Sequence, residues 1–222
     1  MFSEKEKEIA RYIITGLCLP EEFDSDSDYD DYRDSSKMEE IESKVGHVDF
    51  RGGASRLVLV PENHDFVIKV DFDGQSVWNE REENLFFVPY QHQYSSKEYE
   101  RTEKAKENGF SQLFLDMELV TVIHERKFYL QRKAQVIGWN FGPVVSEESL
   151  EKSRSMSGME KECHFVWRAT VVEFYGEQFW HDFIEWNYAN FIGILDDVHG
   201  GNYGYRNGRP VFVDVAGFYD YD

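Results

Sequence analysis

A predicted turn near the C-terminal end of the chain constrains how the surrounding segment folds, and this segment carries the most informative polar residues of the sequence. The turn reads Arg206-Asn-Gly-Arg209, and the apolar run Pro210-Val-Phe-Val-Asp214 follows it. Asn-Gly is the strongest short-range signal for a tight turn between β-strands. The turn therefore predicts a strand that ends at Asp214, and we expect Asp214 to converge with polar residues that precede the turn.

Two of those polar residues are Asp197 and Asn202, which lie in the loop Ile194-Leu-Asp-Asp-Val-His-Gly-Gly-Asn202. Transfer of a γ-phosphoryl group needs an aspartate beside the acceptor hydroxyl, with an asparagine and an aspartate on Mg²⁺. Magnesium prefers such oxygen ligands and keeps several waters. The spacing predicts Asp197 as the base, and Asn202 and Asp214 as magnesium ligands.

The loop from Asp197 to Asn202 reads Asp-Val-His-Gly-Gly-Asn, which resembles the Asp-Leu-His-Pro-Gly-Asn loop of aminoglycoside phosphotransferases more closely than the loop of eukaryotic kinases. The segment Val213-Asp-Val-Ala-Gly217 looks like the Asp-Phe-Gly segment of kinases with two residues inserted before the glycine. This resemblance implies a kinase-like phosphotransferase. It gives His199 a structural hydrogen-bonding role in preference to direct catalysis.

The resemblance also implies a phosphate-covering turn and a lysine on the third strand. The glycine pair Gly52-Gly53 stands between apolar residues, and Ser55 follows it. Glycine lets backbone amides approach phosphates. Lys69 ends a Val-Ile-Lys strand in the manner of the kinase Val-Ala-Ile-Lys pattern. We expect ATP, with Lys69 on its α/β-phosphates and the Gly52, Gly53 and Ser55 segment over them.

A kinase-like lysine also requires a glutamate partner on the following helix. The helix expected from Ser95 to Gly109 offers Glu98, which we favour, and Glu100. An earlier charged stretch offers three further candidates: Glu80, Glu82 and Glu83.

The similarity spans residues 45–217 and is nearest to the short kinase-like proteins encoded by bacteriophages. It implies an α+β fold with two lobes, a small antiparallel β N-lobe and a truncated helical C-lobe. We expect an amphipathic helix over residues 1–20, an acidic flexible linker over 21–40, an N-lobe over 41–135, and a minimal C-lobe over 136–222. The adenine would meet a hinge over residues 131–138.

Short β-rich runs predict the strands of the N-lobe at residues 45–50, 57–60, 66–70, 119–124 and 127–134, with a turn at Glu125-Arg126 joining the last two. Helical spacing predicts a first helix over residues 4–19 and an aromatic helical region over 166–195. The first helix would dock on the domain, and the aromatic stripe would form core.

The chain carries a net charge of −19, which argues against direct nucleic-acid binding, since counterion release needs Lys and Arg on the phosphates. Much of the acidity lies in residues 21–34, typical of a flexible segment. No apolar run is long enough for a membrane span, and no secretion signal begins the chain. Two distant cysteines favour a reducing compartment, so we expect a cytoplasmic protein, in the host cytoplasm if it is viral.

The sequence thus predicts a kinase-like, ATP- and Mg²⁺-dependent phosphotransferase that acts on a protein Ser/Thr or a small-molecule hydroxyl. The alternative is a catalytically inactive kinase-like protein whose acidic surface binds a basic partner, including as a mimic of nucleic-acid charge. The kinase His-Arg-Asp triplet has Leu195 in its histidine position, and the chain stops at Asp222, before the helices that hold a peptide substrate in eukaryotic kinases. Both observations favour either a minimal kinase or a binding protein.

Overall fold

A computed structural model describes residues 1–17, 19, 36–52, 55–79, 84–89, 93–136, 162–190 and 201–215. These residues form a mixed α+β fold with an antiparallel sheet, as the sequence predicts at that level. The chain divides into two compact units. Unit 1 comprises Met1–Tyr99 and Asp116–Lys133, and unit 2 comprises Glu100–Leu115 and Ala134–Asp222.

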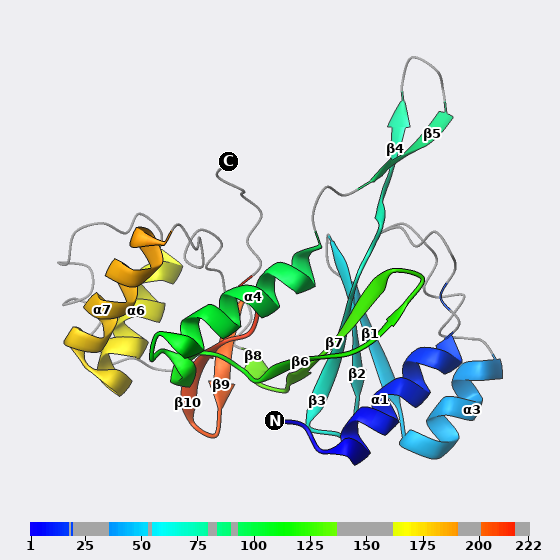
Figure 1. Ribbon diagram of the computed structural model, residues 1–222, viewed down its shortest axis with the longest axis horizontal. Coiled ribbons are helices and arrows are strands. Elements are labelled where there is room, and N and C mark those ends of the chain that lie inside the picture. Colours follow the sequence, from blue (N-terminus) through cyan, green and yellow to red (C-terminus); the bar gives the residue numbers. More distant parts are fainter. Residues whose placement is uncertain are drawn as a thin grey trace. The chain divides into compact units, whose positions relative to one another are not determined.

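Unit 1 is built on a five-stranded antiparallel sheet (Figure 1). The order across this sheet is β1-β2-β3-β7-β6, so the third strand lies at its centre. All five predicted strands are present, with shifts at their ends. Their bounds are β1 Val48–Gly52, β2 Arg56–Pro61, β3 Phe66–Asp71, β6 Met117–Ile123 and β7 Arg126–Arg132.

The central strand β3 shows how the sheet is divided into two chemically different faces. Phe66, Ile68 and Val70 alternate along it and are fully buried in an apolar cluster. Lys69 and Asp71 point to the opposite face, because successive side chains of a strand alternate. One face of the sheet therefore forms hydrophobic core, and the other carries charged groups.

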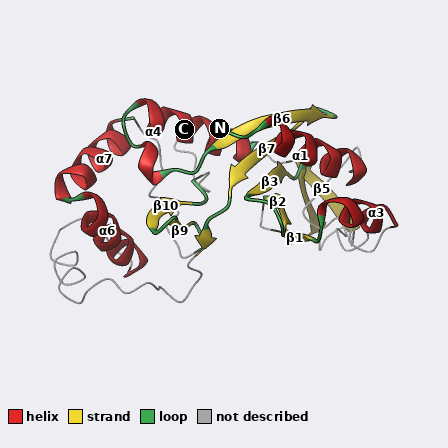
Figure 2. Cartoon of the chain, turned by 90° about the horizontal axis from the view of Figure 1, so that it is seen from below, coloured by secondary structure: helices red, strands yellow, loops and turns green. Residues whose placement is uncertain are grey.

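Helices α1 (Glu4–Leu17) and α3 (Ser36–Val45) contribute to the apolar cluster of unit 1, and they lie beside one another in Figures 1 and 2. Ile13 of α1 and Ile41 of α3 are buried with the core side chains of the sheet. The expected linker over residues 21–40 is therefore wrong for residues 36–40, which are helical because Met38 and Ile41 lie one helical turn apart and bury together. The rest of that segment lies outside the described residues.

The turn between β6 and β7 is displaced by one residue from the prediction. His124 and Glu125 occupy the two positive-φ positions, at 50° and 66°. Arg126, expected in the turn, instead pairs with Ile123 in the ladder and binds the Asp73 carboxylate, with an Nε–Oδ1 distance of 3.0 Å. This ion pair and the ladder keep Arg126 in the strand, so the turn closes one residue earlier.

One further hairpin of unit 1, β4 (Gly74–Asn79) with β5 (Asn84–Pro89), is absent from the predicted strands. It forms its own two-stranded ladder between β3 and the next helix. That helix, α4 (Tyr94–Glu107), begins in unit 1 and continues into unit 2. Gly109, two residues after the end of α4, has a positive φ of 88°, as is common just beyond a helix C-terminus.

Unit 2 combines helices α6 (Glu162–Tyr175) and α7 (Glu177–Ala189) with a three-stranded sheet in the order β10-β9-β8. The strands are β8 Gln135–Val136, β9 Tyr203–Arg206 and β10 Arg209–Phe212, and a short helix η1 spans Ser111–Leu113. The predicted aromatic helical region is confirmed over the described part of residues 166–195, where Gly176, at a φ of 90°, separates two helices.

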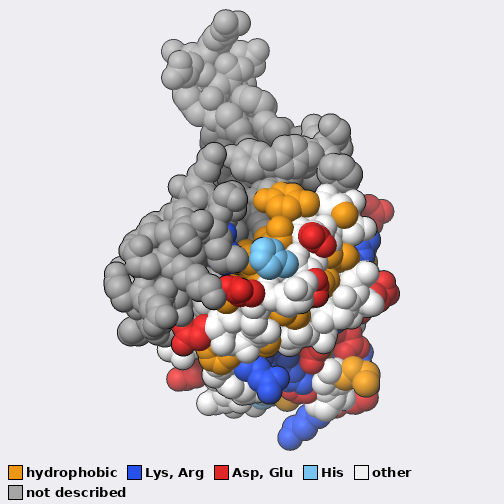
Figure 3. Space-filling view, turned by 90° about the vertical axis from the view of Figure 1, so that its left-hand side faces the viewer, with side chains coloured by type: hydrophobic (Ala, Val, Ile, Leu, Met, Phe, Trp, Pro, Cys, Tyr) orange, Lys and Arg blue, Asp and Glu red, His pale blue; other side chains and the backbone are white. Residues whose placement is uncertain are grey.

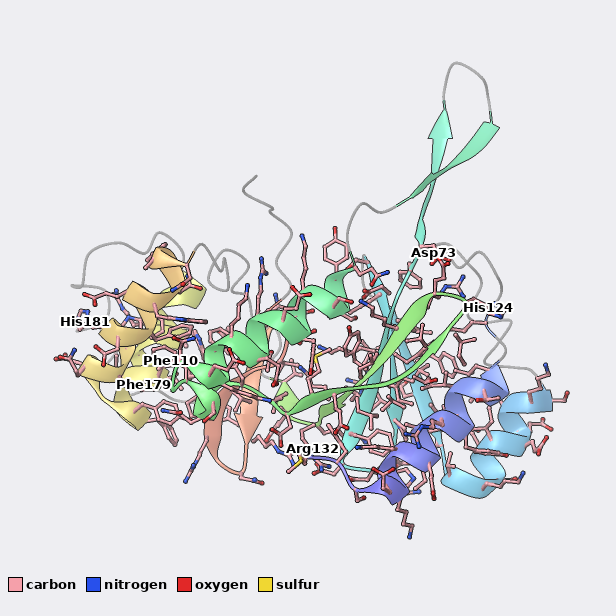
Figure 4. All side chains as sticks on the ribbon, in the orientation of Figure 1. Asp73, Phe110, His124, Arg132, Phe179 and His181 are labelled. Atoms are coloured by element: carbon pink, nitrogen blue, oxygen red, sulfur yellow. The ribbon has the colours of Figure 1, made fainter. Side chains whose placement is uncertain are left out.

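Aromatic side chains make the core of unit 2, as the sequence predicts for this stripe. Phe110 packs edge-on against Phe179 with ring centroids 5.6 Å apart, and the two labelled rings are neighbours in Figure 4. Trp167 and Tyr203, both fully buried, lie with ring centroids 4.6 Å apart. Such contacts add to the area that aromatic side chains bury.

No helix among the described residues is both long and apolar enough to cross a membrane.

Candidate functional site

Lys69 lies on the charged face of β3, where its ammonium binds the carboxylate of Glu98. Its Nζ donates to Oε1 and to Oε2 of Glu98, both at 2.8 Å. The side chains are 4% and 1% exposed, so the pair is removed from water. A charge pair in such surroundings interacts more strongly than on the surface, and each charge depends on the other because an unpaired buried charge is costly.

Glu98 of α4 is therefore the helix glutamate that pairs with Lys69, as favoured from the sequence. The alternatives Glu80, Glu82 and Glu83 lie outside the described residues. The pairing joins β3, at the centre of the sheet, to the helix that follows the β4–β5 hairpin.

Two further donors bind the same carboxylate, and neither was predicted. Arg56 of β2 donates through Nη1 to Oε2 of Glu98 at 2.5 Å, and Gln131 of β7 donates through Nε2 to Oε1 at 2.8 Å. Both side chains are buried. Three adjacent strands therefore supply the donors that hold one helix carboxylate.

The strand register explains why these donors share a face. Val58 of β2 lies opposite Lys69, and Arg56 lies opposite Asp71. Residues directly opposite in an antiparallel pair point the same way, and the alternation along β2 then gives Arg56 the same direction as Lys69. The sequence alone gives no signal for Arg56, because its shared direction with Lys69 follows from the β2–β3 register.

Asp71 links β3 to the start of α4. Its carboxylate accepts the backbone N–H of Ser95 at 3.0 and 2.9 Å and the Ser95 hydroxyl at 2.5 Å. The first N–H groups of a helix have no partner within the helix, and an acceptor from outside satisfies them. Burial raises the pKa of the Asp71 carboxyl, while Arg56 and the bonds from Ser95 act in the opposite direction.

The expected phosphate-covering turn is described only at its two ends. Gly52 ends β1, and Gly53 lies outside the described residues. Ser55 is buried, and its carbonyl accepts the N–H of Phe72 at 3.1 Å, which ties the start of β2 to the end of β3. The roles of Gly52, Gly53 and Ser55 toward phosphate stay predictions.

In unit 2, the Asn-Gly turn forms the hairpin that the sequence predicts. Asn207 and Gly208 both have positive φ, at 53° and 75°, which is the geometry of a two-residue β-hairpin turn. The β9–β10 ladder pairs Tyr203 with Phe212. The strand that leads to Asp214 is therefore confirmed, although its ladder ends at Phe212.

This hairpin brings the backbones of Asn202 and Asp214 together. The Asn202 carbonyl accepts the N–H of Val213 at 2.8 Å and the N–H of Asp214 at 3.2 Å. Just beyond Asp214, the carbonyl of Val215 accepts Nη1 of Arg101 from α4 at 2.7 Å. The two expected magnesium ligands are thus neighbours, and both flanks of Asp214 are held by hydrogen bonds.

Asp197 and His199 fall within residues 191–200, outside the described part of the chain, so the expected base and its neighbouring histidine have no structural placement here. Lys69 and Glu98 belong to unit 1, whereas Asn202 and Asp214 belong to unit 2.

The donor chemistry of the second pair suits a hard cation. Asn202 offers an amide oxygen and Asp214 a carboxylate, the ligand types with which Mg²⁺ combines waters and substrate phosphates. Within the described residues, no group of three or more His, Cys, Asp and Glu side chains could hold a metal by itself. Two protein ligands suit magnesium, which takes its other ligands from waters and substrate phosphates. They do not suit a structural zinc site, which needs four protein ligands.

Comparisons of this chain with protein-family models, with curated proteins and with solved structures gave no match.

Proposed function

We propose that this protein is an ATP-dependent, kinase-like phosphotransferase. Lys69 binds the α/β-phosphates, Glu98 holds that lysine, and Asn202 with Asp214 binds Mg²⁺. Asp197 accepts the proton of the acceptor hydroxyl, which belongs to a protein Ser/Thr or to a small molecule. In this proposal the fold is kinase-like and two-lobed, with units 1 and 2 as its lobes.

The observation that carries the proposal is the buried pair of Lys69 and Glu98 on the third strand and the following helix. Phosphoryl transfer in kinases requires a strand lysine that is paired with a helix glutamate. A strand lysine with only a structural role ordinarily keeps its ammonium in water, whereas the Lys69 side chain is buried. The sheet order around this lysine, with β7 and β6 following α4 in the chain, adds support.

A second, independent support is the hydrogen-bonded neighbourhood of Asn202 and Asp214 in unit 2. The two residues come from a loop and a strand end, and the hairpin between them fixes their separation. Magnesium that is bridged to phosphate needs only one or two protein oxygens of this kind.

The test is Mg²⁺-ATP binding by isothermal titration calorimetry on the full chain. Lys69→Ala and Asp214→Ala should each weaken binding by at least roughly tenfold, equal to about 1.4 kcal/mol. Lys44→Ala and Asp182→Ala remove exposed charges of the same types and should bind as the wild type does. Absence of binding by the wild type at millimolar ATP would overturn the proposal.

A second candidate function, an acidic protein that binds a basic partner without catalysis, is favoured by the net charge of −19. Figure 3 shows acidic side chains on the described part of the face it presents. On α7, Glu177, Asp182 and Glu185 are all exposed. This function predicts binding that weakens steeply with salt and does not depend on ATP.

A further inference from the structure

The first turn of α4 is attached to the sheet at two points one helical turn apart. Ser95 binds Asp71, and Glu98 binds Lys69. Ser95 and Glu98 share a helix face because they are three residues apart, and Lys69 and Asp71 share a strand face because they are two apart. From Ser95 to Glu98 the helix rises by about 4.5 Å toward its C-terminus. Their partners, Asp71 and then Lys69, follow one another by about 6.6 Å toward the N-terminus of the strand, so the helix and the strand run in opposite directions.

Arg56 connects the two points of attachment. It lies directly opposite Asp71 across the β2–β3 ladder and donates to Glu98 at 2.5 Å. Two buried cations, Arg56 and Lys69, thus face two carboxylates, of which Glu98 is buried and Asp71 is partly buried. Gln131 adds a fourth element by donating to Glu98 from β7.

We propose that Asp71, Ser95 and Arg56 are positioning residues that keep Lys69 and Glu98 paired before any nucleotide binds. This inference rests on the proposed function, in which that pair serves the phosphates of ATP. The first turn of α4 then stays attached to the sheet in every state of the protein. Rotation of this helix away from the sheet therefore does not serve to switch the protein between active and inactive states. Lys69 is already in its binding position before nucleotide arrives, so nucleotide binding does not have to supply the free energy of forming the Lys69–Glu98 pair.

The chemistry of the cluster supports a fixed pair. Rotating the helix would take Glu98 away from the buried cations Lys69 and Arg56, and the loss of a bond to a buried charge is costly. It would also take Ser95 away from the partly buried Asp71. Hydrogen bonds at two successive positions of α4 hold the helix in one arrangement more firmly than a single bond does, although the Oε1 atom of Gln131 is buried without a hydrogen-bond partner.

The experiment is an NMR measurement of the Lys69 ammonium group on ¹⁵N-lysine-labelled full chain without nucleotide, with the signal assigned by its loss in Lys69→Arg. The wild type should show a slowly exchanging Nζ signal without ATP. Ser95→Ala and Asp71→Ala should lose that signal while the amide signals of the sheet persist. Asp71→Asn should retain it, because the Asn oxygen still accepts one bond from Ser95.

Ser43→Ala is the matched control, because the Ser43 hydroxyl is exposed on α3 and bonds only locally, to the carbonyl of Glu40. It should leave the Lys69 signal unchanged. In calorimetry, Ser95→Ala should weaken Mg²⁺-ATP binding by roughly tenfold relative to Ser43→Ala.

Two results would overturn the inference: a wild-type Lys69 signal that appears only after Mg²⁺-ATP is added, or a Ser95→Ala spectrum identical to that of Ser43→Ala. If Asp71→Ala does not fold, Ser95→Ala and Asp71→Asn still decide the question. Failure of the wild type to bind ATP would overturn the proposed function alone, because the nucleotide-free spectrum tests the attachment of α4 to the sheet independently.

Discussion

Lys69 and Glu98 form an ion pair in which the ammonium contacts both carboxylate oxygens at 2.8 Å and each side chain is almost completely buried. Replacing Glu98 with Gln keeps the shape but leaves Lys69 and Arg56 opposite a neutral amide. Removing one partner of a buried pair costs about 3–5 kcal/mol, because the other partner stays buried without that opposite charge. We expect Glu98→Gln to lower the free energy of unfolding by about that amount in urea denaturation.

The matched control for this substitution is Glu103→Gln on the same helix. Glu103 is 42% exposed and pairs with Lys106 at 3.1 Å on the surface. Exposed pairs contribute about 0–1 kcal/mol, so Glu103→Gln should change little. Equal effects of the two substitutions would show that the burial of Glu98 has no energetic consequence.

The second prediction concerns acid stability and the pair formed by Glu6 of α1 with Arg132 of β7. The hydrogen bond from Arg132 is the largest cause that lowers the pKa of Glu6 from 4.5 to about 2. A depressed carboxyl pKa stabilises the fold above the unfolded value, and this contribution is lost as the pH falls from about 4.5 to about 2. Glu6→Gln should therefore be less stable than the wild type at neutral pH, by on the order of 1 kcal/mol for a partly exposed pair.

The difference between Glu6→Gln and the wild type should shrink through that same pH window, as measured by urea denaturation at a series of pH values. Glu8→Gln, an exposed position on the same helix, is the control and should track the wild type throughout. A loss of stability in Glu6→Gln that stays constant down to pH 2 would contradict the assigned ion pair.

Arg132, which Figure 4 labels, also stacks its guanidinium on the Phe2 ring, with 4.1 Å between Cζ and the ring centroid.

The parts of the site that could be predicted from the sequence are those set by local chemistry. The Asn207-Gly208 turn needs positive φ at both positions, and few other residue pairs adopt it. Lys69 could be placed on a strand because it lies in a short run rich in β-branched residues. Both predictions depend only on residues that are close in the sequence, so the sequence pattern is sufficient to make them.

Arg56 and Gln131 could not be found in this way, because a polar residue on a strand gives no sign of whether its face meets water or a helix. Their burial is decided by Glu98, which is 42 residues from Arg56 and 33 from Gln131 in the chain. Tertiary contacts of that range override local preference. Helix α3 was missed for a related reason, since its few apolar residues gain their burial from α1 and the sheet.

The third prediction tests the aromatic core of unit 2 at Phe183. This fully buried ring has its centroid 5.4 Å from that of Phe110 and 5.9 Å from that of Phe212. Truncation removes the ring and leaves a cavity, so Phe183→Ala should cost about 3–5 kcal/mol. Phe174→Ala, at a position 49% exposed on α6, should cost far less in the same thermal or urea unfolding experiment. Comparable losses would mean that the ring cluster does not form the core of this unit.

The last prediction concerns two glycines of the β9–β10 hairpin, which positions Asn202 and Asp214. Gly208 is required for its backbone conformation, and Gly204 is required for lack of space. A Cβ on Gly208 would meet nothing within 4 Å, so Gly208→Ala suffers only from its φ of 75° and should cost about 1–2 kcal/mol. A Cβ on Gly204 would lie 2.3 Å from the carbonyl oxygen of Gln135, a backbone atom that cannot move without opening the β8–β9 ladder. Gly204→Ala should therefore cost more.

Amide hydrogen exchange distinguishes the two cases. Gly204→Ala should accelerate exchange at Val136, which pairs with Gly204 across the ladder, whereas Gly208→Ala should leave Val136 protected and accelerate exchange within β9 and β10. Asn207→Gly is the control, because glycine adopts the positive φ of this position without strain. Since the carbonyl of Asn202 receives the amides of Val213 and Asp214 at the open end of this hairpin, Gly208→Ala should also raise exchange at Asp214. Unchanged exchange at Asp214 would mean that the turn does not set the separation of the two proposed magnesium ligands.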